Sequence, residues 1–482
     1  MSSFDLSKRW CFYFNEISKI PRESRHEEAI AAYILRFADA HHLFAQQDRW
    51  GNTILRKPAS KGHENMPWLM LQAHMDMVCV KTPDSTHDFA TDPLDLYVEN
   101  GELRARGTTL GADDGVGVAY MLAILEDDQL THPPLECVFT VMEEIGLEGA
   151  LHMAPEQILS RRIISLDGGS ETSTMCCAAG GIKGFVDLPV AKTAPHYGYG
   201  LRIVMHGLAG GHSGIAIDQG HANAICLGER FLHMLEKNRI PFELCAFQGG
   251  AADNSIPQRC TLSLNTDSPE TLCRQLQQFA AMIKVEFHDC ETGILMDAEP
   301  VERFETAYSS TCTHNLLRLI QLLPNGVLSF HIPLQVPSAS NNIGLLLEKD
   351  GRLQLWFRIR GLLDSMMDEL LLKTEAAADC TGGAVHVQIR YPGWNYNGAS
   401  PLRDTYSRVI QRLYGHPAKV EGSHGGNETG VFAGLHPDAD IISIGSIEQN
   451  FHTPQECLNL AAFDRMYRQL VVLLAELADE QK

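Results

Sequence analysis

Helix-like and strand-like patterns of apolar residues alternate along the first part of the chain, from Trp10 to about Phe185. The segment Arg25–Ala40 has the spacing of an amphipathic helix, and the extended segment Asp48–Leu55 follows it. A second helix is predicted over Gly115–Glu126. This alternation predicts an α/β fold with a mixed, mostly parallel sheet flanked by helices.

The pattern changes near His196, where strands and glycine turns become frequent. The run LRIVMHGLAGGHSG is typical of a strand followed by a turn, and His221–Lys237 is typical of a long helix. A similar succession returns between Ser329 and Tyr391, around a helix predicted over Asp364–Ala378. We interpret this region as an inserted α+β domain composed of two similar units.

The α/β pattern resumes from Pro401, with a helix predicted over Leu402–Tyr414, a strand over Ile441–Ile444 and a closing helix over Ala461–Leu477. The chain is therefore predicted to contain one domain in two parts, residues 1–185 and 396–482. The second domain, residues 186–395, is inserted between these parts.

Composition narrows the class of protein. The 482 residues are 44% hydrophobic, enough for a large core. Neither a secretory signal nor a membrane span is predicted, because no basic start precedes an apolar stretch and no run reaches about 18 apolar residues. The 13 cysteines lack a CxxC spacing and fit reduced thiols in the cytoplasm. A net charge of −21 without a Lys/Arg cluster argues against nucleic acid as a partner.

Charged or imidazole side chains stand at the ends of several apolar runs, where turn residues are usual. They lie in the segments LQAHMDMV, GTTLGADDGVG, VFTVMEEIG, IISLDGG and QNFHTPQE, and they are His74, Asp76, Asp113, Glu143, Glu144, Asp167 and His452. Carboxyl ends of strands gather at one edge of an α/β sheet, so the repeated placement favours one shared site. These residue types predict a two-metal hydrolytic centre.

His74 and Asp76 are two residues apart on an extended segment, so both side chains point to one side. Asp76 is placed to accept the second ring N–H of His74 and so to fix its tautomer. Taken alone, this spacing is more often a turn or a surface pair than a metal site.

The carboxylate of Asp113 can bridge two ions about 3.5–4 Å apart. Its alternative role is a cap at a helix N-terminus. Glu143 and Glu144 repel one another unless cations or different roles separate them. We assign Glu144 to a metal and Glu143 to the general base that takes a proton from the activated water, with a solvated glutamate pair as the alternative.

The ligand count supports two ions. One ion would take His74, Asp113 and Asp167, and the other would take Asp113, Glu144 and His452. A lone loop histidine such as His452 is otherwise more often a surface residue. Nitrogen and oxygen ligands suit two Zn²⁺ per chain, and Mn²⁺ or Co²⁺ are accepted substitutes. No HExxH motif occurs, which disfavours a single-zinc site.

Longer motifs resemble a known family. They are IPRESRHEE, LQAHMDMV, GTTLGADDGVGVAYMLAILED, MEEIGLEGA, LDGG, GLAGGHSGIAID, GGAADNSIPQR and SIGSIEQNFHTPQE, and together they span nearly the whole chain. The chain resembles the co-catalytic di-zinc peptidases that include peptidase T and aminoacylase.

The resemblance assigns the same five metal positions, Asp76 as the residue that orients the histidine and Glu143 as the base. It also implies that the inserted domain is a lid, and that His212 polarises the scissile carbonyl. Asn254, Arg360, His424 and Glu428 match substrate-binding positions, with Arg360 on a free carboxylate. The Asp113–Asp114 peptide bond is expected to be cis.

Two features limit what the resemblance implies. Relatives with a short lid take the lid histidine from a second subunit, whereas a doubled lid supplies it within one chain, so a homodimer is allowed but not required. Relatives often read HAGLECG where this chain has HGGNETG at residues 424–430. A more polar wall is therefore expected near the substrate, and the preferred side chain stays open.

The predicted function is metal-dependent hydrolysis of unblocked dipeptides, of Xaa-His type and broader, by a water activated between two metals. The alternative is an N-acyl amino acid deacylase on the same scaffold. A non-catalytic metal-binding scaffold protein is disfavoured, because Glu143 accompanies every ligand.

Overall fold

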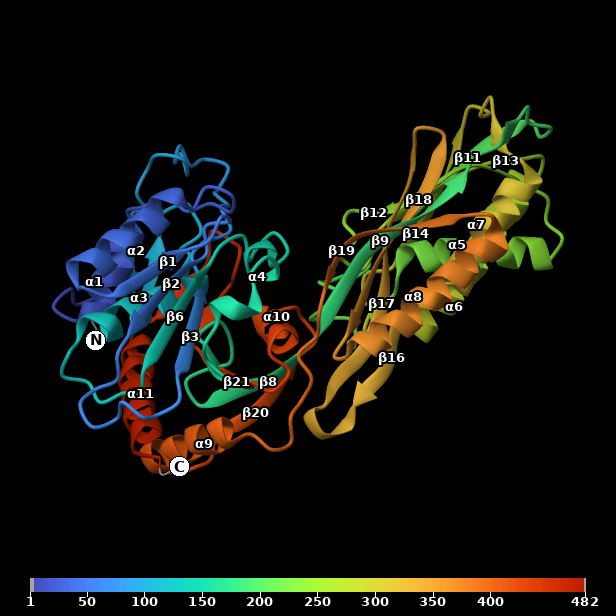
Figure 1. Cartoon of the computed structure of the whole chain (residues 1–482). Helices are drawn as coiled ribbons and strands as arrows, with labels where there is room; N and C mark the ends of the chain where they lie inside the picture. Colours follow the sequence, from blue (N-terminus) through green and yellow to red (C-terminus); the bar gives the residue numbers. More distant parts are fainter. Residues whose placement is uncertain (1–3, 481–482) are drawn as a thin grey trace. The chain divides into compact units, whose positions relative to one another are not determined.

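The computed structural model describes residues 4–480. The chain forms two compact units (Figure 1). The first comprises Met1–Ala178, Trp394–Gly422 and Asn427–Lys482, and the second comprises Ala179–Gly393 and Ser423–Gly426.

The unit boundaries differ from the predicted ones at the start of the second unit, at its end, which is Gly393 instead of residue 395, and in one short segment. A boundary after residue 185 would cut strand β9 (Gly180–Pro189), which pairs along its whole length with β18 (Arg352–Gly361) of the second unit. The segment Ser423–Gly426, predicted within the part 396–482, belongs by its contacts to the second unit.

An eight-stranded mixed sheet forms the centre of the first unit. Its strand order is β1 (Phe44–Gln47), β2 (Thr53–Lys57), β6 (Leu135–Thr140), β3 (Leu69–His74), β7 (Arg162–Ser165), β21 (Asp440–Ser443), β8 (Ser173–Ala178) and β20 (Lys419–Ser423). The central strands β6, β3, β7 and β21 are parallel, whereas β1, β2 and β8 pair antiparallel. Antiparallel strands thus flank this parallel centre, β2 on one side and β8 on the other.

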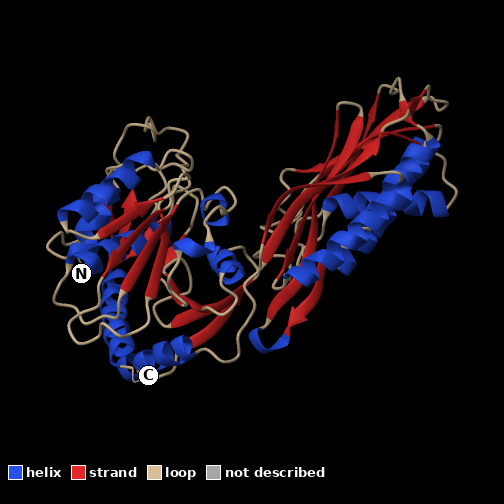
Figure 2. Cartoon of the chain, in the orientation of Figure 1, coloured by secondary structure: helices blue, strands red, loops and turns tan. Residues whose placement is uncertain are grey.

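Helices flank this sheet (Figure 2). One hydrophobic core joins the sheet to α1 (Arg9–Ile17), α2 (Glu28–Ala40), α3 (Ala112–Glu126), α9 (Pro401–Tyr414) and α11 (Leu460–Asp479). The short helices α4 (Glu148–Leu151) and α10 (Glu428–Leu435) contact each other. Strands β22 (Glu448–Gln449), β23 (Cys457–Asn459), β5 (Glu102–Ala105) and β4 (Leu96–Glu99) form a small separate sheet, and η1 (Pro155–Gln157) is a 3₁₀ turn.

The parallel register aligns the carboxyl ends of the central strands. His74, the last residue of β3, lies opposite Thr140 at the end of β6, and Gln72 lies opposite Ser165 at the end of β7. Segments that follow these three strands therefore leave the sheet at one edge. This alignment brings together ligands that are far apart in sequence.

The second unit is a nine-stranded antiparallel sheet. Its order is β14 (Leu295–Val301), β11 (Tyr199–His206), β13 (Cys260–Thr266), β12 (Glu243–Gly250), β17 (Val336–Lys349), β18, β9 and β19 (Ala384–Tyr391), and β16 (Gly326–His331) also pairs with β17. Helices α5 (Ala224–Lys237), α6 (Pro269–Glu286), α7 (Ser310–Leu322) and α8 (Asp364–Thr381) pack on it, with β10 (Lys192–Thr193), β15 (Ala307–Tyr308) and η2 (Ile332–Leu334) as minor elements.

The strand order reveals two copies of one motif. The first copy runs β11, α5, β12, β13, α6, β14, and the second runs β9, α7, β17, β18, α8, β19. Within the sheet both copies have the order fourth, first, third, second strand, and they meet through their second strands, β12 and β17. The sequence prediction of a copy between Ser329 and Tyr391 was incomplete, because β9 and α7 of that copy lie earlier in the chain.

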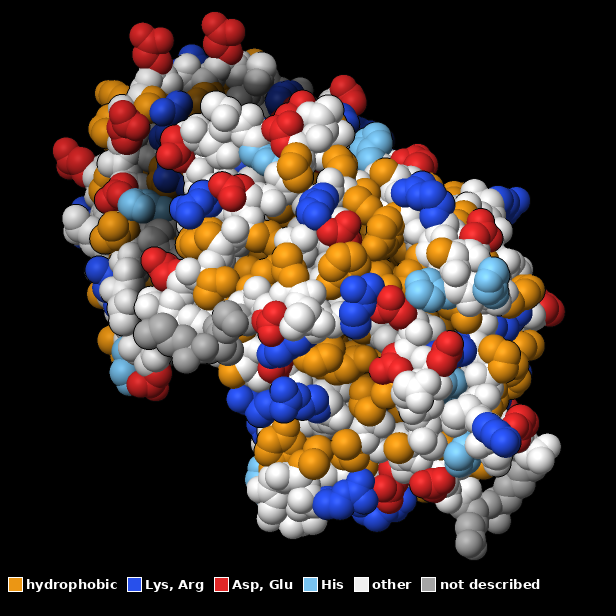
Figure 3. Space-filling model, turned by 90° about the vertical axis from the view of Figure 1, so that its left-hand side faces the viewer, with side chains coloured by type: hydrophobic (Ala, Val, Ile, Leu, Met, Phe, Trp, Pro, Cys, Tyr) orange, Lys and Arg blue, Asp and Glu red, His pale blue; other side chains and the backbone are white. Residues whose placement is uncertain are grey.

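The distribution of charge and the character of the helices can be described briefly. On the face drawn in Figure 3, acidic and basic side chains are interspersed and no broad basic patch is visible. Among residues 4–480, none of the helices combines the length and the apolar character that crossing a membrane requires.

Candidate active site

His74 ends β3 and is almost completely buried. Its Nδ1 lies 3.1 Å from the backbone carbonyl of Asp76 and 3.4 Å from the carboxylate of Asp76. A ring N–H donated to this carbonyl leaves Nε2 as the nitrogen that faces the site. The orienting contact predicted for Asp76 is thus made mainly through its backbone.

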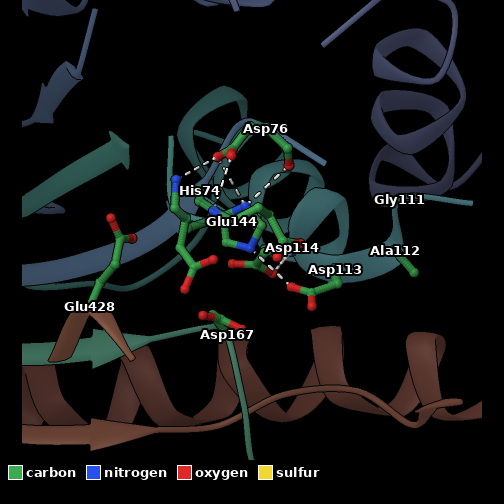
Figure 4. A network of polar contacts seen from close by, with 12 residues as sticks. His74, Asp76, Gly111, Ala112, Asp113, Asp114, Glu144, Asp167 and Glu428 are labelled. Carbon is green, nitrogen blue, oxygen red and sulfur yellow. Dashed lines mark hydrogen bonds and ion pairs between the residues drawn. The ribbon is translucent and has the colours of Figure 1, made fainter. Parts of the chain in front are cut away.

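Asp113 lies between the two imidazoles. Its Oδ1 is 2.9 Å from Nε2 of His74, and its Oδ2 is 3.5 Å from Nε2 of His452. The same nitrogen of His452 is 3.0 Å from Oε1 of Glu144. His74, Asp113 and Glu144 each present a ligand atom within 4.8 Å of the others (Figure 4). The peptide bond between Asp113 and Asp114 is cis, as expected.

The turn after β6 carries Glu143 and Glu144, and Asp76 holds it. Asp76 Oδ1 accepts the backbone N–H of Glu143 at 3.1 Å, and its Oδ2 accepts that of Glu144 at 3.2 Å. Burial raises the pKa of Glu143 well above its ordinary value, and nearby Glu144 raises it further. The carboxylate therefore stands in an environment suited to accepting a proton.

Asp167 follows β7 and points its carboxylate toward the same centre (Figure 4). Burial raises its pKa to about 7, and the charge of Asp113 adds to this effect. Asn427 donates its side-chain amide to Oδ2 and to the backbone carbonyl of Asp167, both at 3.0 Å. Asn427 therefore holds Asp167, a residue of the predicted site.

This donor set fits divalent cations. Hydrogen bonds to Asp113 and Glu144 raise the pKa of His452 to about 10. Burial alone would raise the pKa of Asp113, but hydrogen bonds from His452 and His74 outweigh it and lower that pKa. Two imidazole nitrogens thus face several half-buried carboxylates, and cations between them would offset the crowding of negative charge.

Glu428 begins α10 and is completely buried in the first unit. Its Oε2 accepts hydrogen bonds from Gln72 and Thr140, both at 2.6 Å, whereas its Oε1 has no hydrogen-bond partner among the described residues. Burial raises its pKa to about 8. Figure 4 shows this side chain beside the metal-type cluster.

The other predicted substrate residues lie in the second unit. Arg360, on β18, is 3% exposed, and its Nη2 lies 3.4 Å from Nε2 of His212. Its Nη1 lies 3.5 Å from the hydroxyl of Tyr391. Within residues 4–480 no carboxylate forms an ion pair with Arg360, and burial lowers its pKa. A buried guanidinium without an acidic partner is a strong attractor for an anion.

His424 and Asn254 also lie in this unit. His424 Nε2 is 2.7 Å from the hydroxyl of Ser340. Burial and the charge of Arg360 lower the pKa of His424 to about 3, so its ring is neutral. Asn254 accepts the backbone N–H of Ser213 through its backbone carbonyl at 2.8 Å, which ties its loop to the loop of His212.

Comparison with known proteins identifies the family. The model described as Peptidase family M20/M25/M40 matches residues 70–477. The chain belongs to this peptidase family. Members of it are metal-dependent, so the M20/M25/M40 match confirms the predicted metallopeptidase.

Several relatives of this M20/M25/M40 peptidase are similar over nearly the full length. The cytosol non-specific dipeptidase of Escherichia coli (strain K12) is 32% identical over 470 residues, which cover 96% of each protein. Aminoacylhistidine dipeptidase from Vibrio alginolyticus has a TM-score of 0.87 at 29% identity, covering 97% of this chain and 96% of that chain. Aminopeptidase PepT from Bacillus cereus ATCC 10987 shares the fold, with a TM-score of 0.57 at 17% identity and coverage of 99% and 100%.

These similarities confirm the resemblance to the co-catalytic peptidases. Within that family the sequence also predicts a likeness to aminoacyl-histidine dipeptidase, or peptidase D, and the structural match confirms it. Sequence reasoning missed three buried residues that contact the site segments, namely Arg22, Asn427 and Glu456. Arg22 lies within IPRESRHEE, one of the motifs on which the resemblance rests, but the resemblance gave Arg22 no role.

Proposed function

We propose that this M20/M25/M40 peptidase hydrolyses unblocked dipeptides with two metal ions, and that Glu143 is its general base. The choice of substrate rests on Arg360, which is buried and has no acidic partner among the described residues. A dipeptide ends in a free carboxylate, and a guanidinium binds that group through two parallel hydrogen bonds.

Glu428 is assigned to the other end of the substrate, where a bound ammonium group would favour the charged form of a carboxyl group whose pKa burial raises to about 8. Its Oε1 is buried without a hydrogen-bond partner, while Gln72 and Thr140 fix Oε2. A free α-ammonium group would satisfy this oxygen. An N-acyl amino acid lacks that cation, so Glu428 favours a dipeptidase over a deacylase.

Each metal ion would have three ligands. His74, Asp113 and Asp167 would hold one, and Asp113, Glu144 and His452 would hold the other. Two Zn²⁺ suit this set, and Mn²⁺ or Co²⁺ would substitute. Bound metals supply Lewis acidity that polarises the carbonyl and lowers the pKa of the attacking water.

The side chains of the protein carry out the remaining chemistry. Glu143 takes a proton from the attacking water and later passes it to the leaving amine. Asp76 holds the backbone of Glu143 and Glu144 in position. His212 donates a hydrogen bond to the carbonyl oxygen as negative charge develops there, while Asn254 and His424 line the lid side of the substrate.

We propose cleavage of Xaa-His and of other dipeptides. The names of two relatives, an aminoacylhistidine dipeptidase and a non-specific dipeptidase, support both parts of this range. The substrate is a small peptide and the enzyme acts in the cytoplasm, in agreement with the free cysteines and with the cytosolic relative. In this proposal His212 would come from the same chain, and a homodimer is allowed but not required.

Paired substrates test the proposal. Arg360→Ala is expected to raise KM for dipeptides about 10- to 100-fold and to change KM for C-terminally amidated dipeptides little. Arg352→Ala is the matched control, because Arg352 lies at the other end of β18 and pairs with Asp187. Equal effects of Arg360→Ala on both substrates would exclude the carboxylate contact.

A substrate panel separates the dipeptidase from the alternative deacylase. Faster hydrolysis of an N-acetyl amino acid than of any dipeptide in a panel containing β-alanyl-histidine would identify a deacylase instead.

A further inference from the structure

The backbone N–H and the backbone carbonyl of Gly111, two residues before Asp113, are each bound by a buried charged side chain. Its N–H donates to Oε2 of Glu456 at 3.1 Å, and its carbonyl accepts a hydrogen bond from Nη2 of Arg22. Figure 4 shows Gly111 and Ala112 leading directly into Asp113. The segment that presents the predicted bridging carboxylate is therefore fixed by residues outside the ligand set.

Arg22 joins this segment to the one that carries His74 and Asp76. Its Nη1 donates to the carbonyl of Met75 at 3.0 Å and to that of Asp76 at 3.1 Å. Arg22 is 1% exposed, so these carbonyls replace solvent around the guanidinium. One planar group thus ties two ligand-bearing segments together.

The glycines of GTTLGADDGVG make this contact possible. A Cβ at Gly111, where φ is +65°, would lie within 3 Å of Arg22 and of the sulfur of Met77. A Cβ at Gly115 would lie 2.7 Å from the same guanidinium. The backbone on both sides of Asp113 is therefore shaped around Arg22.

Glu456 joins the Asp113 segment to the loop of His452. Its carboxylate accepts three successive backbone N–H groups, from Leu110 at 2.8 Å, Gly111 at 3.1 Å and Ala112 at 2.8 Å. Its own N–H donates to the carbonyl of Thr453, the residue after His452. Glu456 is 3% exposed. Burying a charged group destabilises the fold unless hydrogen bonds compensate the loss of water. The burial of Glu456 against these backbone groups therefore indicates a role in holding the site.

We infer that Arg22 and Glu456 are positioning residues, which set the carboxylate of Asp113 between His74 and His452 and thereby tune the affinity for metal. This inference rests on the proposed metal site. It predicts that losing either side chain weakens metal binding more than it weakens the fold.

Chelator competition with Zn²⁺ and the visible absorption of the Co²⁺-loaded protein test this inference on the full chain. Glu456→Gln keeps the volume but replaces one accepting oxygen with an N–H₂ group, and Arg22→Lys keeps the charge but loses the planar fork. Each is expected to lower Zn²⁺ affinity about 10- to 100-fold and to change the Co²⁺ spectrum.

Glu136→Gln is the matched control. Glu136 is a completely buried carboxylate at the start of β6, away from Glu143, and it accepts the N–H groups of Leu159 and Ser160. This variant is expected to lower the melting temperature of the metal-free protein about as much as Glu456→Gln, with Zn²⁺ affinity within twofold of wild type.

Two outcomes would overturn the inference. If wild type binds two ions and both Glu456→Gln and Arg22→Lys bind them within twofold of its affinity, the inference fails and the proposed function stands. If wild type binds no metal, the proposed function fails and this inference fails with it.

Discussion

Asp76 holds Glu143 by accepting its backbone N–H at 3.1 Å, while its second oxygen accepts the N–H of Glu144 at 3.2 Å. One carboxylate therefore sets the turn that carries both the proposed base and a proposed metal ligand. The role of Asp76 extends beyond orienting His74, which it contacts mainly through its backbone carbonyl.

Asp76→Asn tests this dual role. An asparagine presents an N–H₂ group to one of two backbone donors, so the turn of Glu143 and Glu144 loses an anchor. We expect kcat and Zn²⁺ affinity both to fall about 10- to 100-fold, measured by steady-state kinetics and chelator competition. Ser24→Ala removes only the hydroxyl that donates to Asp76 Oδ2 at 2.8 Å, and it is expected to have a smaller effect. Unchanged metal affinity in Asp76→Asn would contradict the proposed anchoring.

Asn427→Ala tests the link between Asn427 and Asp167. The substitution removes the amide that donates to Asp167 and the cap of α10, where Oδ1 accepts the N–H of Thr429. Asn459→Ala removes an equivalent cap from α11. Both variants are expected to lose about 1 kcal/mol of stability. Only Asn427→Ala is expected to lose metal affinity, by about tenfold in a Zn²⁺ titration, and equal affinities in the two variants would argue against the link.

How much of the site could be predicted depends on the kind of signal each residue leaves. His74, Asp113, Asp167 and Glu144 follow or interrupt apolar runs, so the sequence itself marks them. Arg22, Asn427 and Glu456 act by binding backbone groups of distant segments. Such contacts depend on tertiary structure, so the spacing of residue types along the sequence cannot predict them.

The fold shows the same limit. Local periodicity predicted the helices and strands of the first unit and the α+β character of the second. It could not place β9 in the second copy of the repeated motif, because the whole first copy separates β9 from α7. Strand order in the sheet, which depends on long-range pairing, was needed to recognise the complete repeat.

The buried carboxyl group of Glu229 predicts that the stability of the second unit depends on pH. It lies on α5, is 5% exposed, and its Oε1 has no hydrogen-bond partner among the described residues. Burial raises its pKa from 4.5 to about 7, Arg230 on the same helix lowers it, and Glu236 raises it. Burial raises the pKa of Cys226 on the same helix, and the charge of Glu229 raises it further. The folded protein is therefore penalised progressively as the pH rises from about 4.5 to about 7, and fully above that range.

Glu229→Gln removes this penalty. We expect its free energy of unfolding to exceed that of wild type by about 1–3 kcal/mol at pH 8, with little difference at pH 4, measured by urea unfolding. Glu236→Gln, at an exposed position of the same helix, is expected to change stability by less than about 0.5 kcal/mol at both pH values. The same gain for Glu229→Gln at pH 4 and pH 8 would contradict the assignment.

The central claim is that Glu143 transfers the proton in metal-dependent dipeptide hydrolysis without serving as a ligand. The most direct measurement compares turnover of a dipeptide with metal content in Glu143→Ala. We predict loss of turnover by at least about 10²- to 10⁴-fold, with about two metal ions retained per chain as in wild type. Near-normal turnover in this variant would contradict the claim, and loss of the metals together with activity would make Glu143 a ligand instead of the base.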